Sequence, residues 1–184
     1  MFHRRTLLAS ALASSLPWPA WAQSSTGSSG KNSLTLGMAL EPPLLDPTVS
    51  AAAAIGEIVH YNLFETLTKI TPEGTVLPLL AQRWDVAPDS KTFTFHLRQD
   101  AQFHNGQPLT ADSVQFSFAR AASSTSTNKD KALFAQLKVT AKDRFTVVIE
   151  SAHSNPDLLF LLGQATAIIV EPQSAATNAT APVG

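Results

Sequence analysis

The chain has 184 residues, of which 44% are hydrophobic and 15% are charged, and its formal net charge is −1. This composition is ordinary for a globular protein, and the length is sufficient for one buried core. Cysteine is absent, which excludes disulfides, thiolate metal sites, cysteine nucleophiles and a lipid-anchored N-terminal cysteine. No basic run interleaves with aromatic residues, so the sequence also argues against nucleic-acid binding.

The first residues follow the order of an export signal. The basic segment MFHRR precedes an apolar stretch, Thr6–Leu16, that is too short to span a bilayer. Ala20-Trp21-Ala22 then has the small-x-small pattern of a signal-peptidase site. We therefore predict a signal peptide over residues 1–22 and a periplasmic, soluble product without a membrane span; a buried N-terminal helix is the alternative. The pair Arg4-Arg5 leaves both the Sec and the twin-arginine export routes open.

The segments that follow the signal alternate between flexible and regular patterns. Residues 23–33 are rich in serine and glycine and predict a flexible leader. Alternating apolar residues between Leu34 and Leu40 predict a strand. Three prolines in Glu41–Pro47 predict a rigid loop. Ala51–Ala54 then opens a predicted helix whose apolar residues recur at helical spacing up to Leu63.

Turn residues between apolar segments predict three hairpins. The first turns at Thr71–Gly74, and the second joins Trp84–Val86 to Thr92–Leu97. The third pairs the segment Leu137–Val139 with Phe145–Ile149. In the second hairpin the two phenylalanines and the leucine of the later strand point to one face, which predicts that this face belongs to the core.

The remaining segments complete an interspersed pattern of strands and helices. A helix is expected to begin after Thr110, with that side chain as its cap. Ser123–Lys131 predicts a mobile polar loop, Ser154–Gly163 a short helix and Ala165–Val170 a final apolar strand. The pattern indicates an α/β or α+β fold with a mixed sheet.

The residue types that carry catalysis or bind metals lack the required spacing. His96 and His104 are separated by a bend and do not have the spacing of a zinc site. Glu65, Asp100 and Asp112 each have a structural role at an exposed position, a turn or a helix start. No nucleophile elbow, metalloprotease helix or phosphate loop occurs. We predict no enzyme, metal or cofactor, with an exported hydrolase as an unfavoured alternative.

One continuous segment carries a family resemblance. LAQRWDVAPDSKTFTFHLRQDAQFHNGQPLTADSVQFSFAR, residues 80–120, resembles the extracytoplasmic solute-binding proteins of family 5 of ABC importers, the peptide/nickel-binding type. The upstream motifs LLDP, LFETL and EGTVLP also have counterparts, and the resemblance extends from Leu34 to Gly184. Two positions depart from the family pattern: Ser90 replaces the usual glycine of a turn, and Ser113 replaces an acid at a helix start.

The resemblance implies both a fold and a function. The fold is α/β, the mixed-sheet first lobe of a two-lobed type II periplasmic-binding-protein clamshell, with the second lobe missing. Residues 34–184 are then a truncated, partial solute-binding domain, expected to bind weakly or not at all alone. The implied function is capture of a peptide or similar small solute for an inner-membrane ABC permease. A ligand-sensing regulatory domain of the same fold is the alternative.

The resemblance also implies where a solute binds, in the segment after the LDP loop and in the loop after the Thr-Ala helix. The predicted ligand-binding residues are Thr48, Val49, Ser50, Ala51, Ala52, Ala53 and Lys129. Small residues at a helix start leave backbone N–H groups accessible to a carboxylate or a carbonyl. The alternative is that the alanines only start a helix well.

Overall fold

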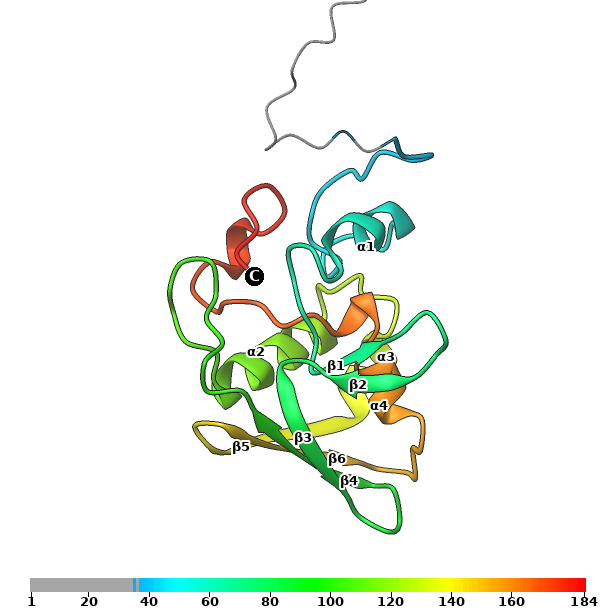
Figure 1. Ribbon diagram of the computed structural model, residues 1–184. Coiled ribbons are helices and arrows are strands. Elements are labelled where there is room, and N and C mark those ends of the chain that lie inside the picture. The colour runs from blue at the N-terminus through cyan, green and yellow to red at the C-terminus, as the bar shows by residue number, and fades with distance from the viewer. Residues whose placement is uncertain (1–34, 36) are drawn as a thin grey trace, which may run out of the picture. The chain divides into compact units, whose positions relative to one another are not determined.

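The computed structural model describes Thr35 and residues 37–184, and Met38–Gly184 forms one compact unit. The predicted signal peptide and leader lie outside the described residues. The main feature of the unit is a four-stranded sheet in the order β3-β4-β6-β5 (Figure 1). Its strands are β3 (Ala81–Val86), β4 (Thr92–Leu97), β5 (Leu137–Asp143) and β6 (Thr146–Ser151).

The core lies between this sheet and helix α2 (Ala111–Ala122), which crosses it (Figure 1). Side chains of β4 alternate between half-buried and buried, and Phe93, Phe95 and Leu97 are at most 1% exposed. Phe118 of α2 packs against Phe134 of α3 (Lys131–Gln136), with ring centroids 5.0 Å apart. Burying each of these large side chains contributes about 1.5–3 kcal/mol to folding. The predicted core face of the second hairpin is therefore confirmed.

The three predicted hairpins are also confirmed, and every strand pair within residues 37–184 is antiparallel. The first hairpin is a separate two-stranded sheet of β1 (Thr68–Ile70) and β2 (Val76–Pro78). Its turn contains Gly74 at φ +82°, a left-handed conformation that glycine adopts without steric cost. The turn between β3 and β4 places Ser90 at φ +53°, a left-handed conformation that glycine adopts more readily than serine.

The prediction of a strand at Ala165–Val170 is wrong. The segment starts with a 3₁₀ turn, η1 (Ala165–Ala167), and continues as buried extended chain outside any sheet. The Ile169 N–H donates to the Glu65 carbonyl at 2.9 Å, and the Val170 N–H donates to the Ser117 hydroxyl at 2.9 Å. The run is apolar because it is buried beside α2, and an apolar run alone does not distinguish buried loop from strand.

Other predicted elements are shorter than expected or absent. Residues 38–40 are not a strand, and helix α1 (Ala53–Val59) begins after Ala51 and ends before Leu63. Helix α4 (Leu158–Leu161) is only the central part of the predicted helix. Thr110 occupies the N-cap position of α2, but its hydroxyl contacts the Ser113 hydroxyl at 3.3 Å and does not cap the helix backbone.

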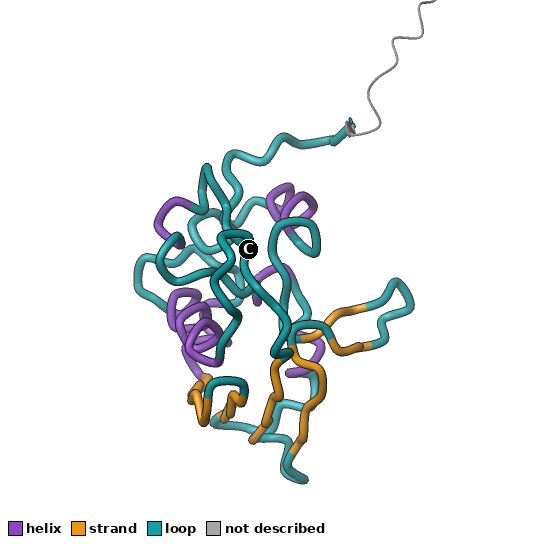
Figure 2. Tube along the Cα trace, turned by 60° about the vertical axis from the view of Figure 1, so that its left-hand side comes forward, coloured by secondary structure: helices purple, strands orange, loops and turns teal. Residues whose placement is uncertain are grey.

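Residues 171–184 pack against the start of the unit. The Glu171 carboxylate accepts hydrogen bonds from the N–H groups of Gln173 and Ser174, and η2 (Ala175–Thr177) follows. The Ala179 carbonyl then accepts the Leu45 N–H at 2.9 Å. Figure 2 shows the strands gathered towards the lower end of the unit, with helices beside them and most of the loops above.

Leu158 and Leu162 are fully buried, so this chain itself covers the apolar face of α4. Within Thr35 and residues 37–184, no helix combines the length and the hydropathy needed to cross a bilayer.

Candidate functional site

A pocket of about 390 Å³ lies among the start of α1, the loop before α3 and η1, and we call it the α1–η1 pocket. Five of the seven predicted ligand-binding residues line it: Ser50, Ala51, Ala52, Ala53 and Lys129. The other lining residues are Pro47, Gly56, Glu57, His60, Gln164, Ala165 and Thr166. The structure thus brings together the two predicted segments, which are far apart in the chain.

Thr48 and Val49, the other two predicted residues, do not line the pocket. Thr48 is only 5% exposed, and its backbone carbonyl accepts the Thr127 N–H at 2.9 Å. Val49 is 44% exposed and lies outside the lining. Thr48 therefore joins the segment before α1 to the loop before α3 and does not line the pocket.

Hydrogen bonds before and after Lys129 fix the loop that leads into α3. The Asn128 side-chain amide donates to the Thr166 carbonyl at 2.8 Å, and the Thr166 hydroxyl donates to the Asp130 carboxylate. The Ser126 hydroxyl, itself buried, accepts the Asn128 N–H at 3.1 Å. The segment predicted to be a mobile polar loop therefore makes buried hydrogen bonds that hold Lys129 at the pocket edge.

The opposite wall depends on close packing of α1 against η1. A Cβ added to Gly56 would lie 3.2 Å from the Ala165 Cβ, which is tighter than most van der Waals contacts. Ala52 occupies the N-cap of α1, and its methyl side chain cannot accept a hydrogen bond from the first turn. Ala51 and Ala53 are exposed. This wall therefore offers small side chains and backbone groups.

The sequence reasoning found Lys129 but missed the other two titratable groups of the pocket, Glu57 and His60. Glu57 and His60 follow Ala53 at i+4 and i+7, so helical spacing would have placed them on the same face. Gln164 and Thr166 carry no comparable sequence signal, because η1 reaches the pocket through tertiary packing.

His60 is uncharged in the folded chain at neutral pH. Burial lowers its pKa from the ordinary value of 6.5, and the Gly163 backbone partly offsets this effect. The Gly163 carbonyl already accepts the Tyr61 hydroxyl at 2.9 Å, and His60 Nε2 is buried without a hydrogen-bond partner in the described part of the chain. The pocket therefore contains one acid, Glu57, one base, Lys129, and a neutral imidazole.

The other three histidines of the described residues, His96, His104 and His153, do not line this pocket. His96 is on the polar face of β4, with Nε2 3.2 Å from the Asp85 carboxylate. The His104 N–H donates to the Gly184 carbonyl at 2.8 Å. Among residues 35 and 37–184, no cluster of three or more histidines or carboxylates is arranged to bind a metal ion.

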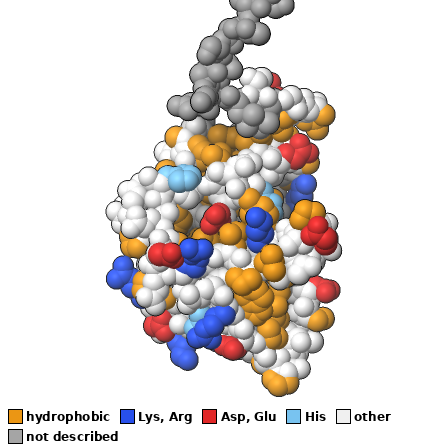
Figure 3. Space-filling view, viewed as in Figure 1, with side chains coloured by type: hydrophobic (Ala, Val, Ile, Leu, Met, Phe, Trp, Pro, Cys, Tyr) orange, Lys and Arg blue, Asp and Glu red, His pale blue; other side chains and the backbone are white. Residues whose placement is uncertain are grey.

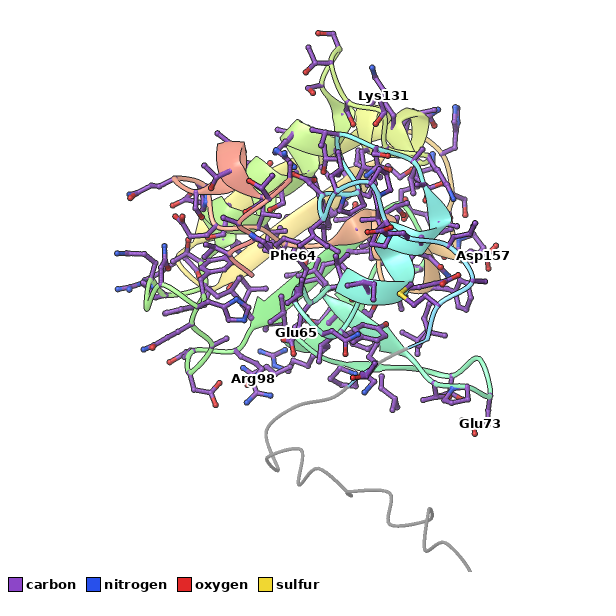
Figure 4. All side chains as sticks on the ribbon, turned by 90° about the horizontal axis from the view of Figure 1, so that it is seen from above. Phe64, Glu65, Glu73, Arg98, Lys131 and Asp157 are labelled. Atoms are coloured by element: carbon purple, nitrogen blue, oxygen red, sulfur yellow. The ribbon has the colours of Figure 1, made fainter. Side chains whose placement is uncertain are left out.

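A second pocket, of about 350 Å³, has an apolar floor that includes Phe103, Leu109 and Ile169. Glu65 and Arg98 lie together at its edge, well away from Lys131 at the start of α3 (Figure 4). The predicted ligand-binding residues do not line it.

On the face shown in Figure 3, acidic and basic side chains are interspersed, so no charge of one sign dominates that face.

Comparison with known proteins identifies the class of protein to which this chain belongs. The family described as "Bacterial extracellular solute-binding proteins, family 5 Middle" matches residues 75–184, more than half of the chain. The chain belongs to this family.

Relatives with curated names agree with the family assignment. The chain is 30% identical over 174 residues to the probable D,D-dipeptide-binding periplasmic protein DdpA of Escherichia coli (strain K12), covering 92% of this chain and 32% of the relative. It is 35% identical over 117 residues to the periplasmic oligopeptide-binding protein OppA of Haemophilus influenzae, covering 62% and 21%. The chain therefore spans about a third or less of the length of these relatives.

Solved structures show the same fold. AgaA from A. tumefaciens R10, in complex with agropinic acid, gives a TM-score of 0.71 at 28% identity and covers 78% of this chain and 30% of that chain. H. influenzae OppA, in complex with the peptide RPPGFSPFR, gives 0.68 at 26% identity and covers 74% and 30%. The predicted fold class, α/β of the type II periplasmic-binding-protein kind, is confirmed, and the described strands contribute an antiparallel sheet to it.

Proposed function

We propose that this chain captures a small solute outside the cytoplasm as the binding component of an ABC importer, and that the α1–η1 pocket contacts the solute. Membership of a solute-binding family supports the role. The observation that carries the location is that Ser50–Ala53 and Lys129, from two distant segments, line one pocket. Its volume of about 390 Å³ falls within the range of roughly 300–1,000 Å³ that is usual for ligand pockets.

The solute class that we propose is a peptide or a similar zwitterion. Two named relatives bind a dipeptide or an oligopeptide. In the pocket, Lys129 can donate to a carboxylate and Glu57 can accept from an ammonium group, and charge-assisted hydrogen bonds of this kind are stronger than neutral ones. Nickel chelates, glutathione, haem and sugars are the competing solutes.

The proposed setting is the periplasm, with an inner-membrane ABC permease as the partner. We expect weak affinity from the described residues alone. Tight sites bury about 70–90% of the surface of a small ligand, whereas the α1–η1 pocket is open on one side. The binding experiment therefore has to detect millimolar affinities.

The test is a nuclear magnetic resonance titration of the 184-residue chain with di-alanine and tri-alanine. Peptide binding is expected to shift the amide signals of Ser50–Ala53 and of Gln164–Thr166. Lys129→Ala is expected to weaken binding about fivefold, because a solvent-exposed charge pair contributes up to ~1 kcal/mol. Lys142→Ala is the matched control, since Lys142 is an exposed lysine on β5 that lies outside the pocket.

Equal weakening by the two alanine variants would show that the peptide does not bind at Lys129. Shifts that cluster at Glu65 and Arg98 would move the site to the second pocket. Efficient hydrolysis of the peptides during the titration would reject the binding role itself.

A further inference from the structure

A buried ion pair involves Asp46, the residue just before Pro47 in the lining of the α1–η1 pocket. The Asp46 carboxylate is 1% exposed, and both of its oxygens accept from the Arg120 guanidinium, with Nη1 at 3.1 Å from Oδ1. Arg120 also donates to the Ala175 carbonyl at 3.3 Å. The pair thus joins the loop before α1, the last turn of α2 and the closing segment of the chain.

Asp46 also fixes the backbone that leads into the pocket. Its Oδ1 accepts the Thr48 N–H at 2.9 Å, so one carboxylate oxygen is shared between this backbone group and Arg120. Its backbone carbonyl accepts the N–H groups of Val49 and Ser50 at 3.2 and 3.3 Å. The direction in which the chain enters Ser50–Ala53 therefore depends on the position of Asp46.

The same hydrogen-bond chain continues to the other pocket wall. The Thr48 carbonyl accepts the Thr127 N–H at 2.9 Å and lies 3.4 Å from the hydroxyls of Ser126 and Thr127. Asn128, the next residue, bonds to the Thr166 carbonyl and precedes Lys129. Polar contacts therefore run without interruption from Arg120 to both predicted ligand-binding segments and to η1.

We propose that Asp46 and Arg120 are positioning residues for the solute pocket. Neither residue lines the pocket, and their contacts set the spacing between Ser50–Ala53 and Lys129. The expected effect of this ion pair on solute binding rests on the proposed function of the pocket. The planar guanidinium reaches both carboxylate oxygens and the Ala175 carbonyl at once, which a lysine ammonium cannot reproduce.

The first measurement needs no solute. Amide hydrogen exchange is compared between the native chain, Arg120→Lys and the core variant Val147→Ala, at temperatures equally far below each melting point. Arg120→Lys is expected to raise the exchange of Thr48–Ser50 and Thr127 about tenfold relative to the amides of the β1–β2 sheet, which contains neither substitution. Val147→Ala, which loses volume from a fully buried position in the sheet, is expected to leave that ratio unchanged.

The second measurement is the dissociation constant for tri-alanine. Arg120→Lys is expected to weaken binding at least fivefold, while Val147→Ala stays within twofold of the native chain. If Arg120→Lys does not fold, Asp46→Asn replaces it, because the amide oxygen still accepts the Thr48 N–H while the charge is lost.

The outcomes separate the two proposals. A native chain that binds no peptide rejects the proposed solute, and the exchange pattern still decides whether the ion pair holds the two segments. Unchanged exchange in the arginine or aspartate variant, or equal loosening in Val147→Ala, overturns the positioning role.

Discussion

The His60 side chain in the pocket makes the stability of the fold depend on pH. Its pKa is lowered in the folded chain by burial, from 6.5. Between that lowered pKa and 6.5 the unfolded chain binds a proton that the folded chain does not, so the free energy of unfolding falls as the pH decreases below 6.5. Above 6.5 the imidazole is neutral in both states and the contribution is constant.

We therefore expect His60→Gln to flatten the loss of stability between pH 6.5 and 5. The measurement is urea unfolding of both chains at several pH values across this window. His96→Gln is the control, because His96 lies on the polar face of β4, away from the pocket. A native chain and a His60→Gln chain with the same slope would show that His60 is not held neutral.

At this scale the sequence predicted the pocket only in part. Small residues after a proline-rich loop, with the family resemblance, led to Ser50–Ala53 and Lys129. Glu57 and His60 could have been found from the spacing of α1, as both lie one or two turns beyond Ala53. Thr166 could not, because its place at the pocket comes from the hydrogen bonds of Asn128 and Asp130.

At the scale of elements, Ala165–Val170 is not a strand, and the Ser117 side chain of α2 supplies the hydrogen-bond acceptor that a neighbouring strand would have supplied. Its hydroxyl donates to the Ser113 carbonyl at 2.7 Å and accepts the Val170 N–H at 2.9 Å, in a site where Ser117 is 4% exposed. Ser117→Ala is expected to destabilise the chain by about 1–3 kcal/mol, because the buried Val170 N–H loses its acceptor. Thermal or urea unfolding measures the loss.

Ser113→Ala is the matched control for that variant. Ser113 is an equally buried serine on the same helix, but among the described residues its hydroxyl forms a hydrogen bond only with the Thr110 hydroxyl, at 3.3 Å. Ser113→Ala should therefore lower the free energy of unfolding less than Ser117→Ala does. The reverse order of stabilities would mean that the Val170 N–H has another acceptor.

The hairpins were predictable because turn residues and side-chain alternation are local. The connection through Val170 was not, because its acceptor is a side chain about fifty residues away and its burial depends on α2. For the same reason the sequence predicts a mobile segment before α3, because its composition is polar while its contacts to Thr48 and Thr166 are tertiary.

At the scale of the whole molecule, the export signal gives a direct prediction. If residues 1–22 are a signal peptide, the mature chain begins at Gln23 and is recovered from the periplasm. N-terminal sequencing of the protein after osmotic shock measures this. Ala22→Trp is the matched variant, because a bulky residue at the cleavage site should prevent processing. A cytoplasmic product that starts at Met1 would contradict the prediction.

The hydrogen bond between the Leu45 N–H and the Ala179 carbonyl can form only late in the synthesis of the chain. A ribosome makes the chain from its N-terminus, so this acceptor does not exist until nearly all of the unit has been made. The carbonyl of Ala175, which Arg120 uses, arrives equally late. The hydrogen bonds of the proline-rich loop and of Arg120 thus remain incomplete on the nascent chain, even after every strand of the sheet has been synthesised.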